Sequence, residues 1–236
     1  MVANTDLSYY DFRLDRDTLS NSLGGGIPEG AIILITGNFG TGKSVLCQRF
    51  SFGFVENGSS VSYVSSETNT KPFMDQMESL DYPIKDYIYD EQLKLIPVYP
   101  LIGQTCSREE KLSKLIESDK LFERDITIID TLSSLIKDTK DKNLSLKALE
   151  HFKRVSSRGK SVFLTLDPDE INKDMITPYK STADVHLDLK RKTIGNEVQR
   201  TINIRRFTTS PGRMQEIIKF RIEPNAGFIV DITQVA

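Results

Sequence analysis

The feature that most constrains this chain is the loop Gly37-Asn38-Phe39-Gly40-Thr41-Gly42-Lys43-Ser44, which fits the pattern G-x-x-x-x-G-K-[ST]. It follows an apolar run and opens a helical pattern, as the motif requires. Its glycines allow backbone N–H groups to surround an oxyanion, and Lys43 supplies a charge for the β- and γ-phosphates. A glycine-rich turn can also arise for backbone reasons alone. We predict that ATP with Mg²⁺ binds here, through Gly37, Asn38, Phe39, Gly40, Thr41, Gly42, Lys43, Ser44 and Val45.

Short β-branched runs alternate with helical patterns over the first two thirds of the chain. Strands are expected at residues 32–36, 61–65, 93–98, 126–129 and 161–165, and helices at residues 43–57, 71–80, 108–120 and 145–158. This alternation is typical of βαβ crossovers, in which helices cover both faces of a mostly parallel sheet. The sequence therefore predicts a three-layer α/β fold.

The pattern changes after residue 182. Strands expected at residues 185–192 and 198–207 flank Gly195-Asn196, a dipeptide that favours a β-hairpin turn. Two more strands, residues 216–222 and 227–232, enclose the turn Pro224-Asn225. We expect these strands to form a C-terminal antiparallel extension of the sheet. No repeat or linker is evident, so we expect residues 1–236 to form a single domain.

Composition narrows the range of partners and compartments. The formal net charge of -2 gives no electrostatic footprint for nucleic acid, and we expect no nucleic-acid partner. The two cysteines, Cys47 and Cys106, fit neither a disulfide framework nor a zinc pattern, and the histidines His151 and His186 lie far from both. The longest apolar runs are strand-sized, and the start of the chain lacks a signal-peptide pattern. We therefore expect a cytoplasmic protein without a transmembrane segment.

Two side chains are candidates for a magnesium site. Asp130 ends the apolar run 126–129, and a carboxylate at the end of a buried strand next to a phosphate loop is typical of a metal ligand. The alternative is a helix N-cap for residues 131–136. Ser44, the last residue of the loop motif, supplies a hydroxyl oxygen of the kind that Mg²⁺ takes. We predict that Ser44 and Asp130 hold the ion.

Three further residues are candidates for catalysis. Glu67 follows the strand expected at residues 61–65, where a carboxylate can orient an attacking water. A solvated loop glutamate is the alternative. Arg205 and Arg206 lie in the strand after the hairpin, from which a guanidinium in a ring can reach the γ-phosphate of a neighbouring subunit. They can equally form a basic pair on a half-exposed strand.

The residues before and after the loop add a resemblance. The lead-in Leu23-Gly24-Gly25-Gly26-Ile27-Pro28-Glu29-Gly30 and the run Val64-Ser65-Ser66-Glu67 resemble KaiC-like members of the RecA superfamily. Within that group, a single domain with Gly40-Thr41-Gly42-Lys43-Ser44-Val45-Leu46 is similar to the FlaH (ArlH) family of archaellum accessory proteins. The resemblance implies the three-layer RecA-like fold of P-loop NTPases over essentially the whole chain.

The same resemblance implies a regulatory or assembly role in the archaeal motility motor. The implied partners are the secretion-type ATPase and the membrane platform protein of the archaellum. The resemblance also implies a homo-oligomer, such as a hexameric ring, at the inner face of the membrane. Active KaiC-like ATPases carry a second glutamate after the first, where this chain has Thr68, and a lysine where it has Ile204. Weak hydrolysis or none is therefore expected.

Other functions remain as alternatives. An active RecA- or KaiC-type ATPase acting on DNA or on another protein is the main one, although Asp167-Pro168-Asp169-Glu170 would repel DNA phosphates. Guanine recognition by Asn-Lys-x-Asp fails, because Asn172-Lys173-Asp174-Met175 has its aspartate one residue early. The basic run Lys190-Arg191-Lys192 is typical of a solvated strand end but also suits an acidic partner or lipid headgroups.

Overall fold

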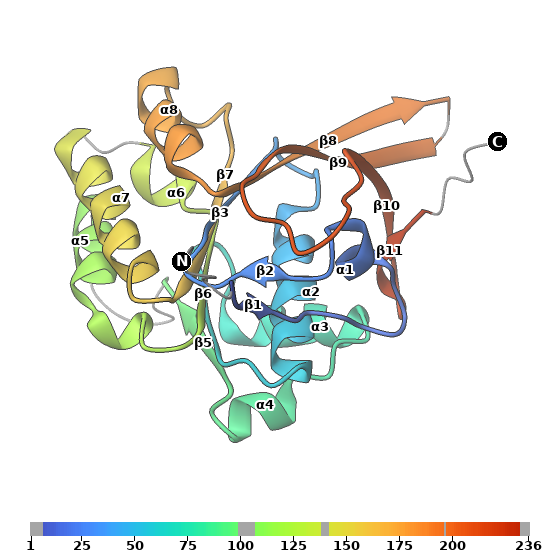
Figure 1. Cartoon of the computed structure of the whole chain (residues 1–236). Coiled ribbons are helices and arrows are strands. Elements are labelled where there is room, and N and C mark those ends of the chain that lie inside the picture. Colours follow the sequence, from blue (N-terminus) through green and yellow to red (C-terminus); the bar gives the residue numbers. More distant parts are fainter. Residues whose placement is uncertain (1–6, 99–106, 138–141, 196, 232–236) are drawn as a thin grey trace, which may run out of the picture.

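One nine-stranded sheet organises the molecule. The computed structural model describes residues 7–98, 107–137, 142–195 and 197–231. The strands are β3 (Ile32–Thr36), β4 (Val61–Ser65), β5 (Leu93–Pro97), β6 (Ile126–Asp130), β7 (Ser161–Leu166), β8 (Val185–Ile194), β9 (Glu197–Phe207), β10 (Ile217–Glu223) and β11 (Gly227–Val230). They lie in the order β11-β10-β9-β8-β3-β7-β6-β4-β5 (Figure 1). Neighbours from β8 to β5 are parallel, whereas β9, β10 and β11 are antiparallel, which confirms the predicted α/β fold and its extension.

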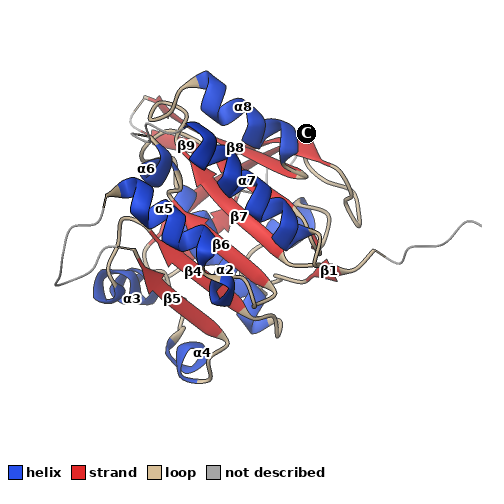
Figure 2. Ribbon diagram, turned by 90° about the vertical axis from the view of Figure 1, so that its left-hand side faces the viewer, coloured by secondary structure: helices blue, strands red, loops and turns tan. Residues whose placement is uncertain are grey.

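Helices cover both faces of the sheet, so the fold has three layers (Figure 2). On one face, Ile33 and Ile35 of β3 belong to a core that includes residues of α2 and α3. On the other face, Ile32 and Leu34 pack in a second core with α5, α6, α7 and α8. The alternation follows from the two-residue period of a strand. The helices are α1 (Leu19–Ser22), α2 (Lys43–Glu56), α3 (Thr70–Ser79), α4 (Lys85–Tyr89), α5 (Arg108–Glu117), the 3-10 turn η1 (Asp119–Leu121), α6 (Ser133–Ile136), α7 (Lys142–Ser156) and α8 (Lys173–Thr182).

The N-terminal segment packs against α2. It forms a small antiparallel ribbon, β1 (Tyr9–Tyr10) with β2 (Ile27–Pro28). The ring of Phe12 contacts those of Phe50 and Phe54, with centroid separations of 5.1 and 5.7 Å. The segment therefore covers the outer side of the helix that follows the glycine-rich loop.

The hairpin of β8 and β9 projects beyond the body of the protein (Figure 1). Residues of β8 up to Leu189 are largely buried, whereas those from Lys190 to Ile194 are exposed. Gly195 has a φ of 61°, as a hairpin turn requires, while Asn196 lies outside the described residues. The exposed run Lys190-Arg191-Lys192 thus lies on the projecting part of a ribbon.

Most predicted elements are confirmed within one or two residues at their ends, but α7 begins three residues before the predicted start at residue 145, and α1, β1 and β2 were not predicted. Three further differences have a local cause. The helix expected at residues 108–120 ends at Glu117, because Ser118 leaves helical geometry and the turn η1 follows. Helix α8 was not predicted, because the helix contains Pro178, which usually breaks a helix interior. The short helix α4 has no buried residue and so gives no periodic signal. Residue 232, the expected end of the last strand, and Cys106 lie outside the described residues.

Candidate functional site

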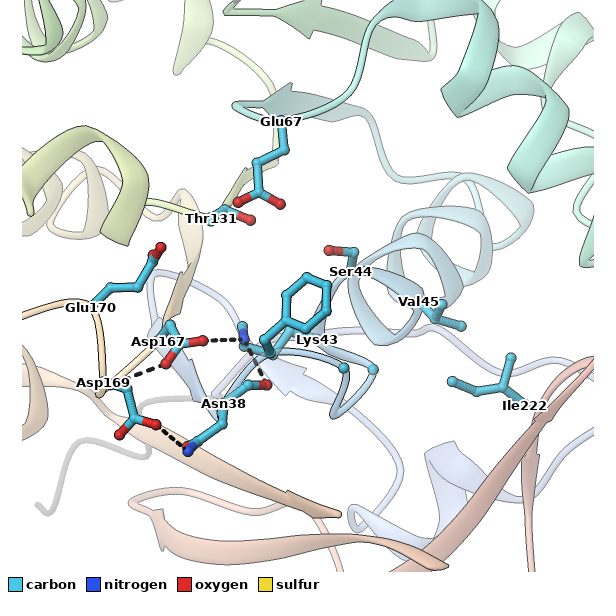
Figure 3. A pocket seen from close by; sticks show the side chains of 13 residues that line it. Asn38, Lys43, Ser44, Val45, Glu67, Thr131, Asp167, Asp169, Glu170 and Ile222 are labelled. Atoms are coloured by element: carbon cyan, nitrogen blue, oxygen red, sulfur yellow. Dashed lines mark hydrogen bonds and ion pairs between the residues drawn. The ribbon is translucent and has the colours of Figure 1, made fainter. Parts of the chain in front are cut away.

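The glycine-rich loop joins the end of β3 to the start of α2 and sits at the edge of the sheet where the parallel strands end (Figure 3). The Lys43 ammonium donates to the carbonyl oxygens of Gly37 at 2.6 Å and Asn38 at 3.2 Å. The Thr41 hydroxyl donates to the same Asn38 carbonyl at 2.8 Å. The loop is therefore folded around the amine of its own lysine.

The C-terminal strands β8 and β10 pack directly against this loop. A side chain at Gly37 would lie 2.7 Å from the Thr41 hydroxyl and 2.9 Å from the backbone oxygen of Leu189. Gly42, the residue before α2, has a φ of 100° and approaches Ile222 of β10. Glycine tolerates both the positive φ and the close approach. The C-terminal strands therefore hold the phosphate loop in place, and a larger residue at either position would move it.

Asp130 lies at the centre of a hydrogen-bonded group beneath the loop. Its carboxylate accepts from the hydroxyls of Ser44 at 3.2 Å, Tyr63 at 2.9 Å and Thr165 at 3.2 Å. Burial raises the pKa of Asp130, although these hydroxyls lower it in part. Helix α6 begins after Leu132, without a side-chain cap, so the N-cap alternative for Asp130 is wrong.

The donor atoms of Ser44 and Asp130 suit a magnesium ion. Mg²⁺ prefers oxygen ligands and is usually held by one or two protein carboxylates together with substrate phosphates and water. Among the described residues, no group of three or more histidine, cysteine, aspartate or glutamate side chains is arranged to hold a metal. A two-residue set at the phosphate loop therefore fits a nucleotide-borne Mg²⁺ rather than an ion caged by protein alone.

A pocket of about 580 Å³ opens above the loop. Seven of the nine predicted binding residues line it, whereas Gly37 and Thr41 serve the loop from within; the seven are Asn38, Phe39, Gly40, Gly42, Lys43, Ser44 and Val45. The side of the pocket next to α2 and β10 is apolar, and the side chains of Val45 and Ile222 lie close to one another there (Figure 3). The other side is acidic. The pocket therefore has an apolar side and an acidic side, and phosphates would bind through Lys43 and the backbone N–H groups of the loop.

Glu67 lines the acidic side and is exposed. Partial burial at the pocket wall raises the pKa of Glu67, and the charges of Asp130 and Glu170 raise it further, while Lys43 and Lys137 lower it. In the described part of the chain, no hydrogen bond or ion pair holds the Glu67 carboxylate. Glu67 thus lines the pocket, as a base would have to, but the described residues hold its side chain in no fixed orientation.

Three acidic residues of the site were not predicted as part of it. Asp167, Asp169 and Glu170 follow β7 and line the pocket. The Asp167 carboxylate lies 3.6 Å from the Lys43 ammonium. Asp167 ends an apolar parallel strand just as Asp130 does, so the same sequence signal was available for it. The run Asp167-Pro168-Asp169-Glu170 indicated only repulsion of DNA.

Arg205 and Arg206 do not line the pocket. Arg205 pairs with Asp188, its guanidinium 3.0 Å from the carboxylate. Arg206 donates to the backbone oxygens of Ser181 at 2.9 Å and Ala183 at 3.0 Å. A role for either arginine in this chain's own pocket is therefore not indicated, and action on a neighbouring subunit stays a prediction.

Comparisons with known proteins agree with this arrangement. A family model described as "ATPase: KaiC" matches residues 16–234. The archaeal flagellar ATP-binding protein FlaH of Methanocaldococcus jannaschii is 37% identical over 224 residues, 94% of this chain and 96% of that protein. The protein of the same name from Methanococcus voltae is 32% identical over 230 residues, 98% of this chain and 100% of its own length.

Two solved structures share the fold. The crystal structure of the flagellar accessory protein FlaH from M. jannaschii superposes with a TM-score of 0.86 at 35% identity, over 97% of this chain and 100% of that one. A KaiC-like protein from Pyrococcus horikoshii OT3 gives a TM-score of 0.75 at 20% identity, over 95% and 99% of the two chains, which is a likeness of fold alone. Within the described residues, no helix is long and apolar enough to cross a membrane.

Proposed function

The chain belongs to the KaiC family of ATPases, and we propose that it is a Mg²⁺-dependent ATP-binding component of the archaellum motor that regulates or assembles the motor and hydrolyses ATP weakly or not at all. The relatives named FlaH are archaeal flagellar ATP-binding proteins, and this chain covers almost their whole length.

The arrangement of Lys43 and α2 supports nucleotide binding. The Lys43 side chain is 10% exposed and lines the pocket, so its ammonium is the cation that entering phosphates would meet there. The N-terminal end of α2 points at the same space and favours anions. Ser44 and Asp130 would be the protein ligands of a bound Mg²⁺. The ion would reduce the repulsion between the negative phosphates and the carboxylates of the pocket.

The hydrolytic half of the site is incomplete, and this observation carries the proposal. A hydrolytic base acts efficiently only when its side chain is held in the geometry of the reaction. Glu67 is exposed, and no hydrogen bond or ion pair of the described residues holds its carboxylate. The next residue in the chain is Thr68, so no second carboxylate follows Glu67 directly. The Thr68 amide donates to the Ser65 hydroxyl at 3.1 Å. Bound ATP would therefore act as a conformational signal rather than as fuel.

The proposed partners are the secretion-type ATPase and the membrane platform protein of the archaellum, at the inner face of the membrane. We also propose a homo-oligomer such as a hexameric ring, in which Arg206 or Arg205 approaches the nucleotide of a neighbouring subunit. Neither arginine lines its own pocket, and Arg205 would have to leave its ion pair with Asp188 to reach a neighbouring one. Release of Arg206 from the Ser181 and Ala183 carbonyls would be needed first.

The test measures ATP binding and ATP turnover on the same samples, with and without Mg²⁺ and over a range of protein concentrations. We expect micromolar binding that weakens without Mg²⁺ and turnover below about one per minute, well under the usual range of enzymes. Dependence of affinity on protein concentration would report the oligomer.

The matched control is Lys43→Ala, which should abolish nucleotide binding while circular dichroism shows an unchanged fold. Unaltered binding by this variant would refute the assignment of the site. Turnover that rises on addition of DNA would refute the proposal in favour of an active ATPase that acts on nucleic acid.

A further inference from the structure

The loop between β7 and α8 is fastened to the phosphate loop by two carboxylates (Figure 3). Asp167 lies 3.6 Å from the Lys43 ammonium, and both side chains are only 10% exposed. Asp169 accepts a hydrogen bond from the Asn38 amide at 2.5 Å. The loop is fixed internally as well, because the Asp169 N–H donates to the Asp167 carboxylate at 3.0 Å. Two residues of the phosphate loop are thus bound to acidic side chains of one neighbouring loop.

The same segment is also attached to the residues that follow Asp130. Glu170 accepts from the Ser133 hydroxyl at 2.8 Å and pairs with Lys137, also at 2.8 Å. Through these bonds, residues 167–170 connect the phosphate loop to α6 on one side and lead directly into α8 on the other. A displacement of this loop would therefore also move its contacts with α6 and the start of α8.

Lys43 cannot serve Asp167 and a polyphosphate equally well. An ammonium has three protons to donate, and in the present arrangement two of them already meet backbone oxygens. An entering phosphate must share the lysine with a carboxylate of the same sign of charge. Because the Lys43 and Asp167 side chains are each only 10% exposed, this repulsion is only weakly screened.

We infer that Asp167 and Asp169 are affinity-determining residues of the nucleotide site: they bind Lys43 and Asn38, compete there with the nucleotide's phosphates, and are released when the nucleotide binds. The inference rests on the proposed binding of ATP at Lys43. It adds that the loop of residues 167–172 is where the bound state is distinguished from the empty one. Nucleotide binding and release of the loop are then thermodynamically linked. Any change that stabilises the contacts of Asp167 with Lys43 and of Asp169 with Asn38, here called the clamp, therefore weakens nucleotide binding.

The experiment compares nucleotide affinity in Asp167→Asn, Asp169→Asn and the double variant with that of the wild-type chain. Fluorescent ATP and ADP analogues serve as probes, with and without Mg²⁺. Asparagine keeps the size and an acceptor oxygen but removes the charge. We expect Asp167→Asn to bind both nucleotides about fivefold to fiftyfold more tightly, as removal of one nearby like charge predicts. The gain should be larger without Mg²⁺, when the nucleotide carries more negative charge.

Two controls isolate the cause. Asp174→Asn removes the same charge from an exposed position in the first turn of α8 and should leave the affinity within about twofold. Asp167→Glu retains the charge and should show no gain in affinity. A merely structural clamp predicts the opposite result, because its loss would loosen the phosphate loop and weaken binding.

The outcomes separate this inference from the proposed function. Unchanged or weaker binding by both Asp167→Asn and Asp169→Asn, with the wild type binding normally, would overturn only the inference. An equal gain in Asp174→Asn would also overturn it, because general electrostatics would then suffice. If the wild-type chain bound no nucleotide, the proposed function itself would fail.

Discussion

The ion pair of Asp17 and Arg49 is completely buried, and its removal tests how the N-terminal segment is held. The two guanidinium nitrogens Nε and Nη2 donate to the Asp17 oxygens at 2.8 and 2.7 Å, and both side chains are 0% exposed. The third nitrogen, Nη1, donates to the Phe12 carbonyl at 2.7 Å. Gly53 leaves room for this contact, since a side chain there would lie 2.4 Å from the guanidinium. Arg49 thus links α2 to two points of the N-terminal segment.

Substitution of Asp17 by asparagine leaves the Arg49 charge buried without a counterion. Breaking a buried pair from one side costs about 3–5 kcal/mol, because the remaining charge stays desolvated. For a chain of this size, each kcal/mol lowers Tm by about 2–4 °C, so the melting temperature should fall by about 10 °C. Replacement of both partners by apolar residues, Asp17→Leu with Arg49→Met, should recover much of the loss.

Urea unfolding, followed by circular dichroism, measures the free energy of unfolding of each variant. The matched control is Asp11→Asn, which breaks the pair of Asp11 and Arg13, with side chains 38% and 65% exposed, and should cost under about 1 kcal/mol. A loss below about 1 kcal/mol in Asp17→Asn would refute the reasoning, because it would mean that Arg49 finds water or another partner. Equal losses in the two variants would refute it as well.

Two other predictions concern titratable groups. Glu67→Gln should slow any residual hydrolysis by about tenfold or more while ATP affinity stays within about twofold, as parallel turnover and binding assays would show; an equal loss of both would contradict its role as a base. Burial lowers the pKa of His186 to about 4, below the value of about 6.5 in the unfolded chain. The unfolded state therefore binds more protons between these values, so the stabilisation present above about pH 6.5 should be lost as the pH falls toward 4. After allowance for the solvent that reaches this ring, the change in the free energy of unfolding is about 1–2 kcal/mol. Urea unfolding at a series of pH values should show that this free energy falls more steeply with falling pH in the wild type than in His186→Gln. Equal pH dependence in the two proteins would count against the assignment.

Most of the strands were predictable because β-branched and other apolar residues gather in short runs of strand length, as in β3, β6 and β7. The run 126–129 also placed Asp130 at the end of a strand. What these local patterns lack is the order of strands in the sheet. Chain order alone does not say that β7 and β6 come between β3 and β4, because that order depends on long-range packing.

Helix α8 and the acidic loop before it show the limit of local patterns. Pro178 and the polar character of residues 173–182 argue against a helix, yet Met175, Ile176 and Tyr179 are buried against the second core. The energy of that packing exceeds the local preference. Once the helix forms, its preceding loop is brought to the phosphate loop.

The sequence by itself predicted a nucleotide site at Gly37 to Ser44, because the motif is contiguous and its chemistry resides in the local backbone and two side chains. It also determined that Glu67 has no adjacent carboxylate. Only the tertiary structure decided which residues share Lys43. Asp167 is 124 positions away along the chain, and the contact exists because β3 and β7 are parallel neighbours whose ends meet at one edge of the sheet. Proximity of this kind arises from strand pairing, which a local motif does not encode.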